Sequence, residues 1–436
     1  MSLNSTPKSD RIHIGIFGRR NAGKSSLINA ITGQPMAIVS DIKGTTTDPV
    51  SKAMEILPMG PVLITDTPGM DDDSELGAAR IAKAVQVLNK TDICVLVVDA
   101  GCPLSDEESE LIDKFRAKGL PFIVAANKSD LYGTACSTGI DNNTAAEDTA
   151  APVNDTGITH GHPKTDSLWQ SLKDRLPSAE NLIYVSAKTG ENIFELKELI
   201  AKQIVEREKF PILKDLIAPG DNVVLVIPID SAAPKGRIIL PQQQALREVL
   251  DAGAVAIVTR ETELAAALNG LQKPPTLVVT DSQAFGLVSK IVPEDVPLTG
   301  FSVLFARHKG DLRRLYEDVK VLDTLKEGDT VLISEGCTHH RQCDDIGTVK
   351  MPAWIKKYTG IDNLNFEFTS GTDFPENLSN CKLVVHCGGC MLNEREMKYR
   401  ISTAKAQNTP IVNYGIIIAY MNGILDRAVA PFKGNF

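Results

Sequence analysis

The stretch RIHIGIFGRRNAGKS, residues 11–25, decides the fold of the first part of this chain. An apolar, β-branched run leads into GRRNAGKS, which fits the pattern G-x-x-x-x-G-K-[ST], and an amphipathic helical stretch follows. In this strand–loop–helix context backbone N–H groups surround nucleotide phosphates, the lysine reaches the outer phosphates and the next hydroxyl binds magnesium. The residues that we expect to contact the nucleotide or its magnesium here are Gly18, Asn21, Ala22, Gly23, Lys24, Ser25 and Ser26.

Outward from this loop, residues 11–206 alternate short β-branched runs with longer amphipathic runs. The runs that we expect to be strands are RIHIGIFG, PVLITD, DICVLVVDA, PFIVAANK and NLIYVSA. This alternation predicts a parallel sheet with helices on both faces. Residues 133–166 interrupt it with Ala, Thr, Asp, Asn and Gly in no regular period, which indicates a mobile surface insertion.

Three further motifs follow predicted strands and identify the nucleotide. DTPG, residues 66–69, would place Asp66 near the magnesium and the Gly69 amide at the terminal phosphate. In NKSD, residues 127–130, the Asp130 carboxylate can accept both hydrogen bonds from the N1 and 2-amino edge of guanine, a donor pair that adenine lacks. SAK, residues 186–188, adds a backbone amide for the base oxygen. The motifs therefore predict GTP, with base-side contacts from Asn127, Lys128, Asp130, Ser186 and Ala187.

Residues 11–206 with these motifs resemble the TrmE/Era-like branch of translation-factor-type GTPases. The resemblance implies that Thr46, or else Thr45, in GTTTD binds magnesium in the GTP state, and that Asn21 holds a potassium ion. Asn21 could instead only cap a turn. Many GTPases carry a water-orienting glutamine after DxxG, but this chain has Met70. The resemblance then gives Asp72 the role of catalytic acid beside Lys24 and Thr46; the alternative is a solvated acidic loop.

The rest of the chain predicts two smaller α/β domains. FPILKDLIAPGDN, residues 210–222, reads as a linker because of its Pro and Gly. Residues 221–307 then show strand-like and helix-like runs without a cluster of titratable groups, which favours a structural or self-associating role. Residues 308–436 carry the strand-like runs DTVLISEG, NLNFEF, CKLVVH and TPIVNYG. The predicted fold class is thus α/β: an N-terminal P-loop GTPase domain (1–210) with a parallel sheet, followed by these two domains.

Thiol and imidazole groups cluster after two strands of the last domain. CTHHRQC, residues 337–343, follows one strand, and HCGGC, residues 386–390, follows another. The carboxyl ends of parallel strands form the edge at which ligands bind, and the two glycines allow both sulfurs of HCGGC to face one point. Three thiolates with a fourth, non-cysteine position suit an iron–sulfur cluster with one labile iron. A Cys2His2 zinc site is the alternative.

This pair of motifs behind a TrmE-like GTPase resembles HydF, the family of GTPase maturation factors of iron-only (FeFe) hydrogenases. The resemblance implies a 4Fe-4S cluster on Cys337, Cys387 and Cys390. Candidates for its fourth ligand are His339, His386, the carboxylates Asp344 and Asp345, and an exogenous group; Cys343 and His340 are expected to be neighbours. It also implies a homodimer through the middle domain, and a scaffold that receives a two-iron precursor from two radical-SAM maturases and delivers it to the FeFe-hydrogenase apoprotein.

Composition argues against several classes of protein. A net charge of −9 and the lack of an interleaved basic and aromatic stripe predict no nucleic-acid partner. This counts against the main alternative, a TrmE-like tRNA-modification or ribosome-assembly GTPase with a structural zinc site. The sequence shows neither a signal pattern nor an apolar stretch of membrane-spanning length, so we expect a cytoplasmic protein without membrane contact. Eight cysteines are too sparse for a disulfide scaffold.

Overall fold

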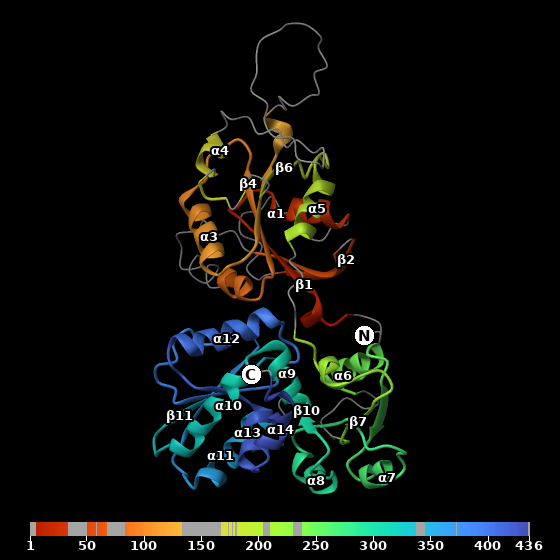
Figure 1. Cartoon of the computed structure of the whole chain (residues 1–436). Coiled ribbons are helices and arrows are strands. Elements are labelled where there is room, and N and C mark those ends of the chain that lie inside the picture. Colours follow the sequence, from red (N-terminus) through yellow and green to blue (C-terminus); the bar gives the residue numbers. More distant parts are fainter. Residues whose placement is uncertain are drawn as a thin grey trace. The chain divides into compact units, whose positions relative to one another are not determined.

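The computed structural model describes two compact units, Met1–Glu206 and Arg207–Phe436, and each is described by itself (Figure 1). The residues that it describes are 6–33, 50–57, 59–67, 83–132, 167–172, 174–176, 178, 181–203, 210–229, 238–336, 345–371 and 373–434. The predicted insertion at 133–166 and the predicted switch residues Thr46, Gly69 and Asp72 lie outside them.

The first unit is built on a six-stranded sheet with the order β2-β3-β1-β4-β5-β6. Its strands are β1 (Ile12–Phe17), β2 (Val50–Ile56), β3 (Gly60–Asp66), β4 (Ile93–Asp99), β5 (Phe122–Asn127) and β6 (Leu182–Tyr184). All neighbours are parallel except β2, which runs antiparallel to β3. The five predicted strands are confirmed. The sequence analysis missed β2 because this edge strand, VSKAMEI, alternates polar and apolar residues and has few β-branched ones.

Helices cover both faces of this sheet, as predicted (Figure 1). They are η1 (Lys8–Asp10), α1 (Lys24–Thr32), residues 83–89, α3 (Asp106–Ala117), η2 (Ser129–Leu131), α4 (Ser167–Leu172) and α5 (Ile193–Gln203). Apolar residues of α1 and α5 bury one face of the sheet, and those of α3 and α4 bury the other. The motif-bearing loops follow β1, β3 and β5, so they meet at the carboxyl edge of the parallel strands.

The second unit contains two four-stranded parallel sheets, which agrees with the predicted α/β class. The first has the order β10-β9-β7-β8, and the second has the order β12-β11-β13-β14. The first comprises β7 (Asn222–Val226), β8 (Val255–Thr259), β9 (Leu277–Thr280) and β10 (Leu298–Gly300), with η4 (Lys214–Leu216), α6 (Leu240–Asp251), α7 (Leu264–Asn269), α8 (Phe285–Ile291) and α9 (Phe301–Lys309).

The second sheet of this unit carries the thiol motifs. Its strands are β11 (Thr330–Glu335), β12 (Asn365–Ser370), β13 (Leu383–His386) and β14 (Ile411–Asn413). Its helices are α10 (Leu312–Asp318), η5 (Val319–Thr324), the π-helical turn η6 (Ile346–Lys350), α11 (Met351–Thr359), α12 (Glu394–Ala406), α13 (Tyr414–Met421), α14 (Leu425–Val429) and η7 (Ala430–Phe432). The run GDLRRLYEDVKVLDTL, residues 310–325, whose pattern predicts one helix, forms α10 and η5 instead.

One hydrophobic core joins the two sheets of the second unit. It runs from Ile212 to Phe432 and contains buried residues of α9, α13 and α14 together with strands of both sheets. Two sets of polar contacts reinforce it. The Thr299 hydroxyl donates to the Ala428 carbonyl (2.7 Å), and the Arg427 guanidinium donates to carbonyls after α8, including that of Val292 (2.9 Å). Each of the two predicted small domains carries one of these sheets, and the two sheets pack together in one compact unit.

Within the described part of the chain, we find no helix that is long and apolar enough to cross a membrane.

Candidate functional site: a nucleotide loop and a thiol turn

The loop between β1 and α1 has the backbone that a phosphate-binding loop requires. Gly18 has φ 138°, and a Cβ there would lie 2.2 Å from the Val97 carbonyl oxygen. Gly23 has φ 93°, and a Cβ there would lie 2.2 Å from the Asn127 amide nitrogen. Both positions therefore exclude larger residues. The loop lies directly against β4 and β5, and α1 begins at Lys24.

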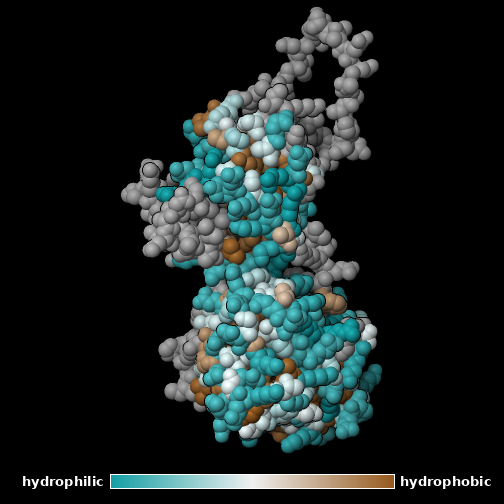
Figure 2. Space-filling view, turned by 90° about the vertical axis from the view of Figure 1, so that its left-hand side faces the viewer, coloured by the Kyte–Doolittle hydropathy of each residue, from teal (hydrophilic) through white to brown (hydrophobic). Residues whose placement is uncertain are grey.

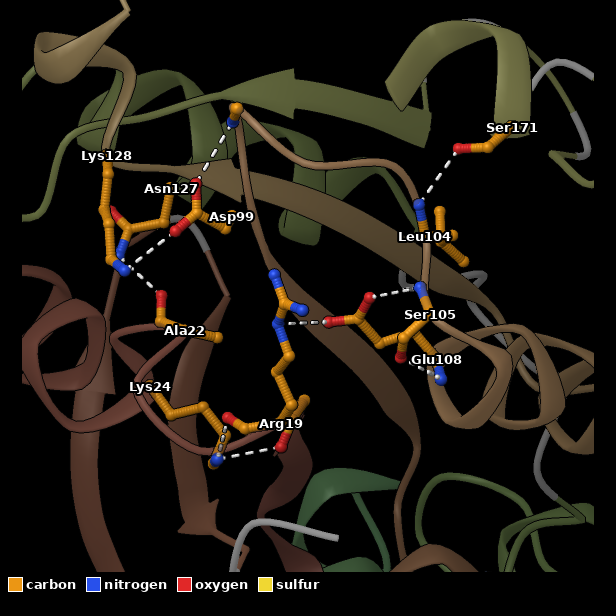
Figure 3. A network of polar contacts seen from close by, with 12 residues as sticks. Arg19, Ala22, Lys24, Asp99, Leu104, Ser105, Glu108, Asn127, Lys128 and Ser171 are labelled. Carbon is orange, nitrogen blue, oxygen red and sulfur yellow. Dashed lines mark hydrogen bonds and ion pairs between the residues drawn. The ribbon is translucent and has the colours of Figure 1, made fainter. Parts of the chain in front are cut away.

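The Lys24 side chain is folded over this loop. Its ammonium nitrogen donates to the carbonyl oxygens of Gly18 and Arg19, both at 2.8 Å (Figure 3). The side chain is buried, with the residue 8% exposed. A buried ammonium held at the mouth of the loop is well placed to neutralise charge on the outer phosphates of a nucleotide.

Ser25 and Asp66 form the predicted magnesium position. The Ser25 hydroxyl donates to Asp66 Oδ2 at 2.8 Å, although the two residues come from α1 and β3. Asp66 is buried, and its Oδ1 atom has no hydrogen-bond partner among the described residues. Burial raises the pKa of Asp66 above its ordinary value, since the charged form lacks solvent. A divalent cation at this carboxylate would supply the missing partner, so the residues fit magnesium.

The base-side motifs are linked to one another and to the loop. The buried Asn127 side chain donates to the Ala22 carbonyl (2.9 Å) and accepts from the Ala187 amide (3.0 Å). The Ser186 hydroxyl donates to Asp130 Oδ1 at 2.7 Å. The Lys128 ammonium pairs with Asp99 at 2.8 Å (Figure 3). The structure thus brings together the predicted residues of loop, NKSD and SAK around one edge of the sheet.

A polar network beside the loop was missed by the sequence analysis. The Arg19 guanidinium lies 3.5 Å from the carboxylate of buried Glu108, which also accepts from the Ser105 amide (3.0 Å) at the start of α3 (Figure 3). The Leu104 amide donates to Ser171 of α4 at 3.2 Å. The run S-x-x-E at residues 105–108 is a capping-box signature, so the helix start was readable, but the partner Arg19 was not.

Residues 386–390, HCGGC, form a turn that we call the thiol turn. It lies at the carboxyl ends of β11 and β13. Ser334 pairs with His386 across the two strands, and the Cys387 amide donates to the Ser334 carbonyl at 3.0 Å. The Cys387 sulfur accepts from the backbone amides of Gly336 (3.0 Å) and Gly389 (3.4 Å). Cys337 comes directly after Gly336 in the sequence, but Cys337 and His339 lie outside the described residues. The structure therefore brings the residue that precedes one motif to a sulfur of the other.

The two described cysteines of the turn are partly shielded from solvent. Burial raises the pKa of Cys387 to about 11, although both amide donors oppose the rise. Burial also raises the pKa of Cys390, and the nearby Lys309 ammonium opposes it. A bound cation would reverse this preference for the neutral thiol, because metal ligation deprotonates thiols.

His386 was one candidate for a fourth ligand, and both of its ring nitrogens have partners. Nδ1 donates to the Cys387 carbonyl (2.6 Å), and Nε2 accepts from the Arg400 guanidinium (2.9 Å). Burial and the Arg400 charge lower the pKa of His386 to about 3, so the ring is neutral. Within the described ranges, no group of three or more His, Cys, Asp and Glu side chains is arranged to hold a metal ion. The ligand roles of His386 and His339 stay predictions.

Glu335 is a further buried acid that the sequence analysis did not single out. It ends β11, and its carboxylate accepts from the Tyr414 hydroxyl at 3.3 Å. Its charge contributes to the raised pKa of Cys387. Glu335 lies in the predicted strand run DTVLISEG, and nothing in that run indicated that its carboxylate would lie beside the thiols.

Three family models match successive segments of the chain, one in the first unit and two in the second. Residues 13–128 match the family model described as 50S ribosome-binding GTPase. Residues 212–310 match the hydrogen maturase F dimerization domain, and residues 313–431 match the hydrogen maturase F tetramerization domain.

Curated relatives and solved structures of GTPases resemble part of this chain. GTPase Der of Kosmotoga olearia is 37% identical over 129 residues, which are 28% of this chain and 29% of that protein. GTPase Der of Heliobacterium modesticaldum is 29% identical over 221 residues, 49% of this chain and 44% of that protein. This chain thus spans less than half the length of either relative. A single-residue variant of Era of Aquifex aeolicus bound to GDP.AlF4− is 20% identical, with a TM-score of 0.35 over 64% of this chain and 97% of that one.

These matches indicate what kind of domain the first unit is and to which family the whole chain belongs. A GTPase family model matches residues 13–128, in the unit whose loop geometry suits a nucleotide and magnesium, and this supports GTP and magnesium binding and, in general terms, GTP hydrolysis by this unit. Both hydrogen maturase F models then follow in order across the second unit. The chain therefore belongs to the hydrogen maturase F (HydF) family of hydrogenase maturation GTPases, as the sequence motifs predicted.

Proposed function

We propose that this chain is a scaffold that carries a 4Fe-4S cluster on Cys337, Cys387 and Cys390, and that it delivers a two-iron precursor to FeFe-hydrogenase. The observation that carries this proposal is the 3.0 Å hydrogen bond from the Gly336 amide to the Cys387 sulfur. Cys337 follows Gly336 directly in the sequence. We therefore propose that two motifs that are far apart in sequence supply one site.

The chemistry of the turn supports an iron–sulfur cluster. Amide donors to a ligating sulfur are typical of such sites and help to set their reduction potential. Gly389 has φ 63°, so the turn can bring Cys390 to the same side as Cys387. When bound, the cluster would supply an iron with a replaceable fourth ligand, at which a precursor can attach and leave. The cargo, a two-iron precursor supplied by two radical-SAM maturases, is then a substrate of this site.

GTP is proposed to control partner docking rather than the chemistry of the cluster. The nucleotide machinery belongs to the first unit and the thiol turn to the second, which favours an effect of the nucleotide on docking over direct energy transfer to cluster bonds. Within the first unit we propose potassium at Asn21, whose φ of 60° turns the loop, with Thr46 and Asp72 in the roles predicted for them. Equal affinity for the hydrogenase apoprotein with GTP, with GDP and without nucleotide would contradict this control.

Self-association is proposed to occur through β8, the edge strand of the first sheet in the second unit. Val255 and Val258 of β8 are 51% and 49% exposed, and Leu250 at the end of α6 is also exposed. An exposed apolar edge strand readily pairs with another strand. Figure 2 views this unit from the side of α11, away from α6 and α7, and shows only small, separate apolar patches among hydrophilic residues. A homodimer joined at β8 also agrees with the dimerization-domain match.

Val258→Lys tests the dimer. Light scattering should show a shift from dimer to monomer, because like charges would face each other across paired strands. Lys273→Ala, a substitution elsewhere in the same sheet region, is the control. A dimer that persists unchanged in Val258→Lys would place the interface elsewhere.

Metal analysis tests the cluster. Wild type, Cys387→Ala and the control Cys381→Ala would be purified without oxygen, analysed for iron, sulfide and zinc, and examined by EPR after reduction with dithionite. We expect about four irons and four sulfides per chain in wild type and control. The reduced-cluster signal should be lost in Cys387→Ala. Stoichiometric zinc after expression with ample iron would contradict the proposal and favour a structural site.

A further inference from the structure

A buried arginine lies behind the thiol turn. Arg400 of α12 is 0% exposed, and its guanidinium is directed at the ends of three strands. It donates to Glu396 (2.9 Å), His386 (2.9 Å), the Ser334 hydroxyl (3.2 Å) and the Gly371 carbonyl (2.7 Å), and it lies over the Phe374 ring at 5.2 Å. These contacts hold the guanidinium in one orientation.

The contact with His386 determines which ring nitrogen carries the proton. A guanidinium is always charged and only donates hydrogen bonds, so the facing Nε2 of His386 must accept. The proton of the neutral ring therefore belongs to Nδ1, which donates to the Cys387 carbonyl at 2.6 Å. Arg400 is thus connected through one imidazole ring to the peptide that follows Cys387. The direction of that peptide decides where the Cys387 side chain and the two following glycines lie.

The same guanidinium also holds Ser334, which lies two residues before the amide that donates to the Cys387 sulfur. The Ser334 hydroxyl accepts from Arg400 and from Thr369 (3.0 Å), and the Ser334 carbonyl accepts from the Cys387 amide (3.0 Å). Two residues beyond Ser334, the Gly336 amide donates to the Cys387 sulfur. Both strands that lead into the thiol site are therefore attached to one side chain.

The buried Arg400–Glu396 ion pair is poorly explained by a contribution to the stability of the fold alone. Burying an ion pair such as Arg400–Glu396 costs desolvation energy that the attraction between the charges often fails to exceed. What a hydrophobic replacement could not supply is the pair of bonds to His386 and Ser334. Partners of this kind behind a ligand commonly change metal affinity by about 10- to 100-fold.

We propose that Arg400 is a positioning residue for the thiol turn, which acts through His386 to fix the Cys387 peptide and thereby the direction of its sulfur. In this arrangement His386 is a link in the chain of contacts and is not an iron ligand. The inference deepens the proposed function and rests on it wherever it concerns the cluster. The positioning of Cys387 itself can be tested without a cluster.

The first experiment compares cluster loading of the full chain. Arg400→Gln, Arg400→Lys and the double variant Glu396→Gln/Arg400→Gln, which leaves no unpaired buried carboxylate, would be reconstituted with iron and sulfide. Lys398→Gln, which removes an exposed charge from the same helix, is the control. We expect iron affinity, measured by chelator competition, to fall about 10- to 100-fold in both Gln variants, with a broadened reduced-cluster EPR signal. Arg400→Lys should recover part of the loss. GTP hydrolysis, an activity of the first unit, should stay unchanged, and circular dichroism should report whether the second unit is folded.

The second experiment tests the role of His386. Wild type and His386→Asn would be labelled with ¹⁵N-histidine and compared by pulsed EPR. We expect that wild type shows no histidine nitrogen strongly coupled to the cluster's electron spin that is lost in His386→Asn. An Asn amide can still donate to the Cys387 carbonyl but cannot reach Arg400, so His386→Asn should load iron like Arg400→Gln. A strongly coupled nitrogen that is lost in His386→Asn would make His386 a ligand and overturn the inference.

The third experiment separates this inference from the proposed function. In metal-free protein, alkylation of Cys387 followed by mass spectrometry should be several-fold faster in Arg400→Gln than in wild type and in Lys398→Gln. If wild type binds no cluster but alkylation changes as expected, the proposed function fails and the positioning role stands. If wild type binds the cluster while Arg400→Gln changes neither loading, nor EPR signal, nor alkylation, the positioning role fails alone.

Discussion

The nucleotide loop and the thiol turn are both placed at the carboxyl edge of a parallel sheet, but they obtain their geometry differently. Backbone conformation shapes the loop: Gly18 and Gly23 have positive φ, and Lys24 donates to carbonyls of its own loop. Contacts between distant segments shape the thiol turn, since Gly336, His386 and Arg400 come from three different elements. The first kind of site can be recognised in a short run of consecutive residues, whereas the second requires the fold.

The largest effect that would sharpen this contrast is expected from Lys24→Ala. Removing a phosphate-binding cation commonly costs about 100- to 1,000-fold in rate, so GTP hydrolysis should fall by that factor, measured as phosphate release. Iron loading of the thiol turn should remain at the wild-type level. Lys114→Ala, which alters an exposed lysine of the same unit, should change neither. Loss of iron binding in Lys24→Ala would show that the two sites are not independent.

Asn127→Ala is expected to weaken nucleotide binding next. This side chain connects the loop to SAK, and its removal leaves the Ala22 carbonyl and the Ala187 amide without this partner. The cost of about 1–3 kcal/mol corresponds to about 5- to 150-fold in Kd. Titration with a fluorescent GTP analogue measures it, and Asn89→Ala is the matched control. An unchanged Kd would mean that the loop holds its shape without support from the base side.

Gly389→Ala tests how tightly the thiol turn is built. Gly389 has φ 63°, and an added Cβ would lie 2.6 Å from the Met397 sulfur. We expect the free energy of unfolding of the second unit to fall by about 1–2 kcal/mol, measured by denaturant titration. Iron binding should also be weaker. Gly388→Ala is the control, because a Cβ there meets no atom within 4 Å. Equal effects of the two substitutions would contradict a turn fixed at Gly389.

Glu108→Gln should have the smallest effect. It keeps the capping position at Ser105 but removes the charge beside Arg19. A partly exposed ion pair contributes about 0–1 kcal/mol, so GTP affinity should fall no more than about fivefold. Side by side titrations of Glu108→Gln and Glu107→Gln, the exposed neighbour, measure it. A loss above about tenfold, or roughly 1.4 kcal/mol, would make the Arg19–Glu108 pair a main support of the loop and weaken the contrast drawn above.

Sequence patterns predicted most of the fold because most of it is locally determined. The buried strands of all three sheets are nearly continuous apolar runs. The predicted runs match β1, β3–β6 and β11–β14, and the strand-like runs NVVLVIPID, AVAIVT and PTLVVTD of residues 221–307 match β7–β9. The strands β2 and β10 were missed, since one is an alternating edge strand and the other has only three residues. The shared core of the second unit was also missed, because a pattern within one segment does not report which other segment covers it.

The candidate site likewise contains residues that local motifs predicted and residues whose contacts depend on the fold. Lys24, Ser25, Asp66 and Asn127 belong to motifs whose spacing predicts that they lie close together, and the structure brings them together. The contribution of Glu335, Arg19 and Arg400 could not be predicted, since each acquires its partner through the fold from a residue at least 14 positions away. His386 shows the limit most clearly. Its place beside Cys387 was evident, but the hydrogen bonds of its ring depend on a helix whose register the sequence does not reveal.

The shared core of the second unit has a consequence for how such chains can change during evolution. Because Thr299 and Arg427 tie the first sheet to the last helices, the region after Gly310 is not an exchangeable module. A chain ending there would leave the inner faces of α9 and β10 without cover, and the thiol turn would lose the body that carries it. The proposed self-association and the proposed cargo binding would thus be inherited together, whereas the GTPase unit has a core of its own.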